Sequence, residues 1–492
     1  MSTNTINMTI LVSYLLELNV LFLSTILVVI LASYIIKPLA NIEVTSKYIK
    51  LLAPSSFIGS FFIHLMVSYS YLYSFKWGET FTDMYEVELD TNLVYLQGGA
   101  LSLDLFSLVL ITLAYIVGFI SLTSISDKSF WSNTKHPLIF TFFIIVVILF
   151  VTCDHLFTFF LYYEFLLIPS FFIVYLSSSN MKGVQASMYF LVWTQAGSTL
   201  VLAVVIQLIQ IEGIDYFNQL SSLGLYSSCI EKIKFILFIG FGFKIPIWPL
   251  YYWLTKTHVE ATGAFSMYLS GFLVKTALFG LYKFLLYMSW SYTNVLFITI
   301  ALTGVIMSSL QMWAQVDLKK VVALCTVQEM NLLLICFLFG QTPLVYFGIM
   351  FCFMHAILST LMFFLVDLIQ KRFSTRLTTE LSGIIHICPN LGVSIVLMCL
   401  CFLALPFTLK FTCEFVLFSG ILDLSFVLIL VLMLATNWVA PISFCRAWYG
   451  VIFGSPNSKH YTAHDLDFKD IIVIGLCISL LTLPCTILLG IV

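Results

Sequence analysis

The stretch Phe241–Leu278, FGFKIPIWPLYYWLTKTHVEATGAFSMYLSGFLVKTAL, places two lysines, Lys244 and Lys275, inside apolar runs long enough to enter a bilayer. Pro246 and Pro249 follow the first lysine closely. Because proline lacks an N–H donor and clashes with the preceding turn, we expect the helix to break there. A break at membrane depth is tolerated only where protein or a water-filled cavity surrounds it. A buried lysine beside a break therefore indicates a path for charge through the membrane.

The composition of the whole chain is that of a membrane protein. Of 492 residues, 61% are hydrophobic and 9% are charged, whereas average soluble proteins contain about 25% charged residues. Apolar runs recur along the chain and predict an all-α polytopic membrane protein with about fourteen spans. The spans are expected at residues 8–36, 54–76, 101–124, 137–152, 154–177, 184–211, 232–252, 260–287, 294–315, 320–340, 343–368, 391–422, 424–448 and 470–492.

The chain shows no sign of several common kinds of site. Its net charge of −2 gives no indication of nucleic-acid binding. Its 12 cysteines include no CxxC pair and most lie inside predicted spans, so we expect neither a metal site nor a disulfide framework. A glycine-rich phosphate loop and a cysteine cluster for iron–sulfur ligation are also missing from the sequence. No cleavable signal or transit peptide is expected, because the apolar N-terminal segment has span length and lacks a basic region before it.

Lysines and arginines sort by alternate loops between the predicted spans. One set of loops contains most of them, whereas the other has four: Lys76, Lys232, Lys234 and Lys283. This asymmetry is the positive-inside pattern, and it predicts that both termini lie on the outer side. The cations assigned to no loop are Lys244, Lys275 and Lys410.

Carboxylates inside the predicted spans are few. An ionisable group at bilayer depth costs at least ~2.5–3.5 kcal/mol on insertion scales, so each is a candidate for function. The alternative for each is a polar contact that joins two helices. These carboxylates are Glu17, Glu164, Glu329 and Glu414.

Glu164 is the expected partner of Lys244, because each is the lone charge in the middle of its span. Burial disfavours the charged form of a lysine and a nearby carboxylate favours it, so such a pair can gain and lose a proton. The alternative is a static ion pair, although a buried pair often stabilises no more than an apolar pair. His258 beside the break and His355 in the eleventh span are candidate proton relays, with hydrogen-bonded packing as the alternative.

A second break is expected five spans later, in the segment ALPFTLKFTCEF around Pro406. Discontinuous helices at corresponding places, here helices 7 and 12, indicate an inverted-repeat transporter. Since the interval is odd, the two units would face opposite ways, which predicts two inverted five-helix repeats. The expected divisions are the N-terminal spans and acidic outer-side loop (1–100), a first half (101–292), a second half (293–450), and a C-terminal loop with the last span (451–492).

Several motifs resemble the antiporter-like subunits of respiratory complex I. They are YYEFLLIPS, GFKIPIWPLYYWLTKTHVEA, LSGFLVKTALFGLYKF, DLKKVVALCTVQEMN, FMHAILSTLMFFLVD and LALPFTLKFTCEF. The likeness runs from about Leu96 to the C-terminus and is most specific around Lys244. Glu414 matches the type of subunit that carries glutamate at this position, where the other types typically carry lysine. The departures are Leu254-Thr255-Lys256 in place of Leu-Pro-Asp, Thr262 in place of proline, and Gln328-Glu329-Met330-Asn331 where the family has a histidine.

The resemblance implies a proton-translocating subunit of NADH:ubiquinone reductase with no redox centre and no bound cofactor of its own. NADH, FMN, iron–sulfur clusters and ubiquinone are expected in other subunits. Proton transfer is expected at Glu164, Lys244, Lys275 and Glu414, with His258, Glu329 and His355 as supporting relays. The expected partners are other complex I membrane subunits and lipids, with cardiolipin as a candidate. The expected location is the mitochondrial inner membrane, with both termini on the intermembrane-space side.

Two other functions stay open. One is a stand-alone cation/proton antiporter subunit, which shares these motifs. The other is a non-conducting structural membrane subunit, which the buried charges disfavour because apolar residues would serve a scaffold at least as well.

Glu329 carries a separate expectation. A charged carboxylate at this depth should be either protonated or close to a cation. Lys275 is the expected cation, because its span lacks an acid of its own.

Overall fold

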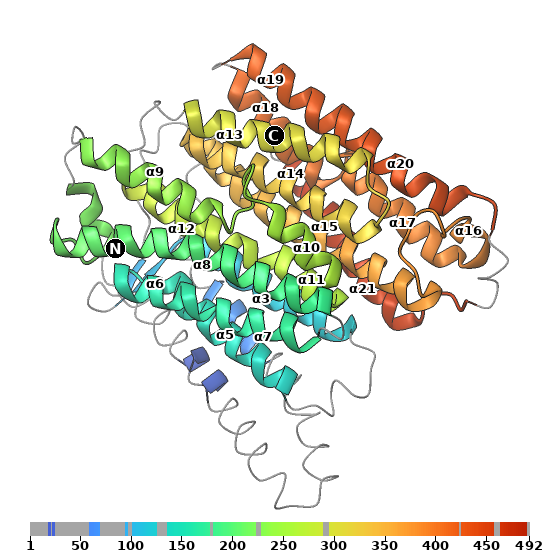
Figure 1. The fold of residues 1–492 in the computed structure, drawn as a ribbon, viewed down its shortest axis with the longest axis horizontal. Helices are drawn as coiled ribbons and strands as arrows, with labels where there is room; N and C mark the ends of the chain where they lie inside the picture. Colours follow the sequence, from blue (N-terminus) through green and yellow to red (C-terminus); the bar gives the residue numbers. More distant parts are fainter. Residues whose placement is uncertain are drawn as a thin grey trace, which may run out of the picture. The chain divides into compact units, whose positions relative to one another are not determined.

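The computed structural model describes residues 18–20, 22–24, 59–68, 94–96, 101–124, 135–177, 181–222, 228–288, 295–422, 425–456 and 463–489. This part of the chain is almost entirely helical (Figure 1), with one antiparallel strand pair, β1 (Val94–Leu96) and β2 (Leu101–Leu103). Its contacts define two units, Met1–Ser170 with Leu202–Gly224 and Phe171–Val201 with Leu225–Val492. Glu17 and the acidic residues between 79 and 90 lie outside the described residues.

The first unit is built around three helices. They are α3 (Leu105–Ser124), α5 (Lys135–Thr152) and α6 (Leu156–Phe165). Helix α5 packs against both α3 and α6, and the short helix η3 (Phe217–Ser222) follows a bridge between His155 and Tyr216. Along the chain, α7 (Leu167–Ser177) and α8 (Met181–Gln210) each begin in one unit and end in the other.

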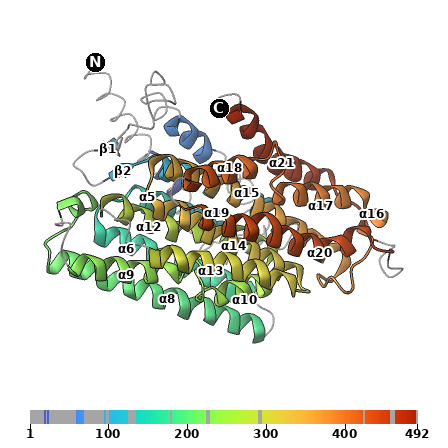
Figure 2. The ribbon, with the colours of Figure 1, turned by 90° about the horizontal axis from the view of Figure 1, so that it is seen from above.

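The second unit is a helical bundle centred on α14. Its helices are α9 (Ser228–Gly242), α10 (Tyr252–Glu260), α11 (Gly263–Tyr268), η4 (Leu269–Leu273), α12 (Val274–Tyr287), α13 (Val295–Trp313), α14 (Leu318–Phe339), α15 (Thr342–Phe373), α16 (Ile384–Ile387), α17 (Pro389–Phe402), α18 (Leu409–Leu422), α19 (Phe426–Met433), η5 (Leu434–Val439), α20 (Ala440–Phe453) and α21 (Phe468–Leu489). Helices α13, α14 and α15 run side by side (Figures 1 and 2), and α14 also contacts α10, α12 and α20. The apolar core of α14 is completely buried, so a polar side chain there must find its partner inside the protein.

Eight helices of the described chain are long and apolar enough to cross a membrane, and three shorter apolar helices accompany them. The predicted class, an all-helical membrane protein, is confirmed. The count of about fourteen spans and the two inverted repeats stay predictions.

Both predicted helix breaks are confirmed. Helix α9 ends at Gly242 and α10 begins at Tyr252. Helix α17 ends at Phe402 and α18 begins at Leu409. Two π-helical turns, η4 and η5, were not predicted from the sequence.

The assignment of Lys283 to an outer loop is wrong. This lysine lies on α12 with a relative exposure of 2%, and its Nζ lies 5.5 Å from the centroid of the Phe279 ring. An aromatic face attracts an ammonium group and helps to accommodate it inside a protein. Sorting charges by loop considers only position along the chain, so it cannot detect this burial.

Candidate functional site

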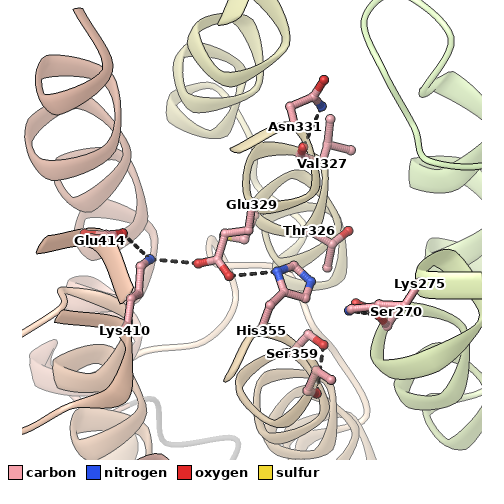
Figure 3. A network of polar contacts seen from close by, with 12 residues as sticks. Ser270, Lys275, Thr326, Val327, Glu329, Asn331, His355, Ser359, Lys410 and Glu414 are labelled. Atoms are coloured by element: carbon pink, nitrogen blue, oxygen red, sulfur yellow. Dashed lines mark hydrogen bonds and ion pairs between the residues drawn. The ribbon is translucent and has the colours of Figure 1, made fainter. Parts of the chain in front are cut away.

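Glu329 of α14 lies at the centre of a buried polar cluster (Figure 3). Its Oε1 accepts a hydrogen bond from Lys410 Nζ at 2.7 Å, and its Oε2 lies 2.8 Å from His355 Nδ1. Lys410 Nζ lies 3.7 Å from Glu414 Oε1. All four side chains are at most 5% exposed. Three helices, α14, α15 and α18, thus bring four titratable groups into one continuous row.

The row meets the second helix break through Lys410. This residue is the second of α18, and its Nζ also lies 3.9 Å from the ring centroid of Phe402, the last residue of α17. Lys410 therefore joins the two sides of the break. Glu414 follows four residues later, a spacing that puts both side chains on one helix face. That spacing was the sequence signal for the pair, although Lys410 was not among the expected site residues.

Glu329 lies beside a cation, as expected, but the cation is Lys410 and not Lys275. Lys275 Nζ instead donates to the carbonyl of Ser270 in the π-helical turn η4. In Figure 3 Lys275 lies on the far side of His355 from Glu329.

The first break surrounds Lys244, which is buried. Two neutral donors satisfy carbonyls of the broken backbone: the Trp253 indole N–H donates to Phe243 O at 2.7 Å, and Asn331 Nδ2 donates to Pro246 O at 3.2 Å. Sequence analysis gave Asn331 no role. It lies two residues after Glu329 on α14, a separation that directs two helical side chains to different sides. One helix thus serves both breaks.

Two of the expected site residues, Glu164 and His258, are not members of this row. Glu164 is half-buried on α6 and belongs to the first unit, whereas Lys244 belongs to the second, so their pairing stays a prediction. His258 of α10 is buried against the ring of Phe363, with centroids 4.5 Å apart. Neither of its ring nitrogens has a hydrogen-bond partner among the described residues.

The described residues contain no group of three or more histidine, cysteine and acidic side chains that could hold a metal ion. The cysteines that the structure describes are free. The row itself consists of carboxylate, ammonium and imidazole groups in contact with one another, an arrangement suited to proton transfer between nitrogen and oxygen atoms.

Comparison with known proteins gives consistent results. Residues 153–439 match the family described as NADH:quinone oxidoreductase/Mrp antiporter, TM. The chain is 39% identical over 388 residues to NADH-ubiquinone oxidoreductase chain 4 of Paramecium tetraurelia, covering 78% of this chain and 82% of the relative. Chain 4 of Chondrus crispus is 28% identical over 391 residues, with 77% of this chain and 76% of the relative covered.

Solved structures show the same fold. The Mrp complex from Dietzia sp. contains a chain with a TM-score of 0.78 at 16% identity, covering 97% of this chain and 96% of that one. The membrane-bound sulfane sulfur reductase, an archaeal respiratory membrane complex, contains one with a TM-score of 0.77 at 16% identity, covering 98% and 95%. Sequence, fold and buried charges agree: the chain belongs to the NADH:quinone oxidoreductase/Mrp antiporter family, among the relatives of its chain 4 subunits.

Proposed function

We propose that the row His355–Glu329–Lys410–Glu414 carries the protons that this chain moves as a membrane-arm subunit of respiratory complex I. The observation behind the proposal is the continuity of the row: each neighbouring pair is within 4 Å, and every member is buried. Ionisable groups are costly at this depth and mark proton and ion pathways in membrane proteins. A scaffold would need none of them.

The charges of the row explain how it handles a proton. With Lys410 protonated and both carboxylates ionised, the formal charge of the row is −1. One further proton, on His355 or on Glu414, makes it neutral. The two carboxylates share one lysine, so their titrations are coupled. A proton gained at one end of the row lowers the proton affinity of the group at the other end. The row therefore stays neutral while the proton moves from His355 to Glu414, and its formal charge returns to −1 when the proton leaves.

The remaining residues extend the path, on the basis of the family resemblance and of the burial of Lys244, Lys275 and His258. Lys275 supplies protons to the row from the His355 side, and Lys244 lies at the first break. Glu164 modulates the charge of Lys244, and His258 is a supporting relay. This gives proton-transfer roles to Glu164, Lys244, Lys275 and Glu414.

The test compares charge removal at the centre of the row with the same change elsewhere. Glu329→Gln in the assembled complex should lower proton pumping per NADH oxidised, measured by the quenching of a pH-sensitive dye in sealed vesicles. NADH oxidation with an uncoupler should stay close to the unmodified rate. Glu212→Gln, at an exposed position, is the matched control.

A second variant sharpens the test. Glu329→His keeps a titratable group at the centre of the row, so it should restore pumping that Glu329→Gln loses. This follows because histidine can gain and release a proton near neutral pH. Unchanged pumping in Glu329→Gln would remove Glu329 from the path.

The wider assignment rests on the two interrupted helices and the relatives. We propose two inverted five-helix repeats within about fourteen spans, with halves at 101–292 and 293–450.

The termini face the intermembrane space of mitochondria, and single cysteines introduced near residues 3 and 490 would be labelled from that side only. Other subunits hold NADH, FMN, the iron–sulfur clusters and ubiquinone, whereas membrane lipids surround this chain. Copurification with an NADH-oxidising assembly separates this function from that of a stand-alone antiporter.

A further inference from the structure

At the C-terminal end of α10, backbone carbonyls accept hydrogen bonds from two cationic side chains that belong to other elements. The last carbonyls of a helix have no partner within the helix. Here Arg376 Nη1 donates to Val259 O at 2.7 Å, and Lys319 Nζ donates to Ala261 O at 2.9 Å. A positive charge is also favourable at this end of the helix dipole. The two donors come from α14 and from the segment that follows α15.

Asp317 contacts the side chain of Arg376 and the backbone of Lys319. Its Oδ2 accepts a hydrogen bond from Arg376 Nε at 2.9 Å, and its Oδ1 caps α14 by accepting the backbone N–H of Lys319 at 2.9 Å. A backbone bridge between Asp317 and Leu377 ties the two segments together. Lys319 has a relative exposure of only 2%. We call Lys319, Arg376 and Asp317 the α10 clasp.

The link from α10 to α11 is enclosed on its other side by α15. Helix α11 begins at Gly263, where a Cβ atom would collide with the carboxylate of Asp367. Only a glycine permits so close an approach. Asp367 is in turn held by Lys371 at 2.7 Å. The short link is therefore closely packed on both sides.

Residues with proposed proton-transfer roles lie on both sides of this link. His258 is on the last turn of α10, and the chain runs from α11 through η4 into α12, which carries Lys275. A displacement of the link would move both side chains relative to the row that ends at His355.

We propose that Lys319 and Arg376 are positioning residues for proton transfer, which set the places of His258 and Lys275 through the carbonyls of Val259 and Ala261. The inference rests on the roles proposed above for His258 and Lys275. It assigns a function to a cluster that lies outside the path itself.

The experiment uses Lys319→Met and Lys319→Arg in the assembled complex, with Lys320→Met as the matched control. Methionine removes the donor, so amide hydrogen exchange in the last turn of α10 should accelerate by about tenfold. Protons moved per NADH oxidised should fall by about two-fold or more, because small misplacements of transfer groups are costly. Arginine keeps the donor yet cannot release a proton inside a protein. It should preserve both the exchange protection and the pumping ratio, as should Lys320→Met.

Each other outcome overturns a defined part of the inference. If Lys319→Met changes neither measurement, the clasp does not position α10. If Lys319→Arg restores exchange protection without restoring pumping, Lys319 carries protons itself and is not a positioning residue. Arg376→Met and Arg376→Lys repeat the comparison at the other donor. Because the Arg376 side chain is 21% exposed, a replacement side chain of different shape can turn toward the surface there without a steric clash. If Lys275→Met pumps normally while Lys319→Met does not, the role proposed for Lys275 fails and the clasp acts through another group.

Discussion

The two interrupted helices of the second unit are stabilised by different means. The first break is buried at Lys244, Ile245 and Pro246, and its carbonyls accept hydrogen bonds from neutral donors. The second break exposes Leu405 and Phe407, by 41% and 68%, and is bridged by the charge of Lys410. Helix α14 supports both breaks, through Asn331 at the first and Glu329 at the second.

The two breaks differ in whether their partners can titrate. Broken backbone at membrane depth needs partners, and a neutral donor supplies one without adding charge. An ion pair supplies a partner whose strength depends on protonation. We therefore expect a change of protonation to alter the ion pairs at the second break, whereas the hydrogen bonds of Trp253 and Asn331 at the first break do not depend on it.

The largest effect is expected at the second break. Lys410→Met should destabilise the complex by about 3–5 kcal/mol, because it leaves Glu329 charged and buried without its cation. Adding Glu329→Gln should recover much of this loss, since the double variant carries neither charge. The measurement is the thermal midpoint of NADH:quinone activity in the assembled complex. Additive losses in the double variant would contradict the pairing.

A smaller effect is expected from Asn331 at the first break. Asn331→Leu leaves the carbonyl of Pro246 without its side-chain donor, which should cost about 1–3 kcal/mol. Unlike Lys410→Met, this change should not be rescued by any alteration at Glu329. Rescue by Glu329→Gln in the same thermal assay would mean that the two breaks are coupled through α14.

Trp253→Phe tests the other neutral donor. The ring remains but the indole N–H to Phe243 O is lost, so the expected cost is about 1 kcal/mol, near the lower end for a buried unpaired carbonyl. Hydrogen exchange of the α9–α10 connection should rise locally. A pattern of exchange unchanged from the parent would show that Trp253 acts by packing alone.

The smallest effect is expected at the exposed tip of the second break. Phe407 has φ 76°, a backbone conformation that glycine adopts without strain. Phe407→Gly should therefore change the stability by no more than about 1 kcal/mol, with relief of strain offsetting the greater freedom of the unfolded chain. A large loss of assembled complex would instead reveal that a neighbouring subunit covers this side chain.

The sequence by itself determined the class of the protein and the places of both breaks. Proline acts on the turn in which it lies, so Pro246, Pro249 and Pro406 could be interpreted without knowing any neighbour. Burial of Lys244, Lys275 and Glu414 followed from the apolar runs around them. These properties depend only on residues that are near in sequence, so they can be predicted from a single sequence.

Only the tertiary structure decided which buried charges meet. Lys410 and Glu329 are 81 residues apart, and Asn331 and Pro246 are 85 apart. Contacts at such separations depend on the rotation of each helix about its axis and on its depth against its neighbours. Most predicted spans are apolar almost all round, so their sequences show no clear polar face that would define that rotation. This is why Lys275 was the expected partner of Glu329, and why packing gave that place to Lys410.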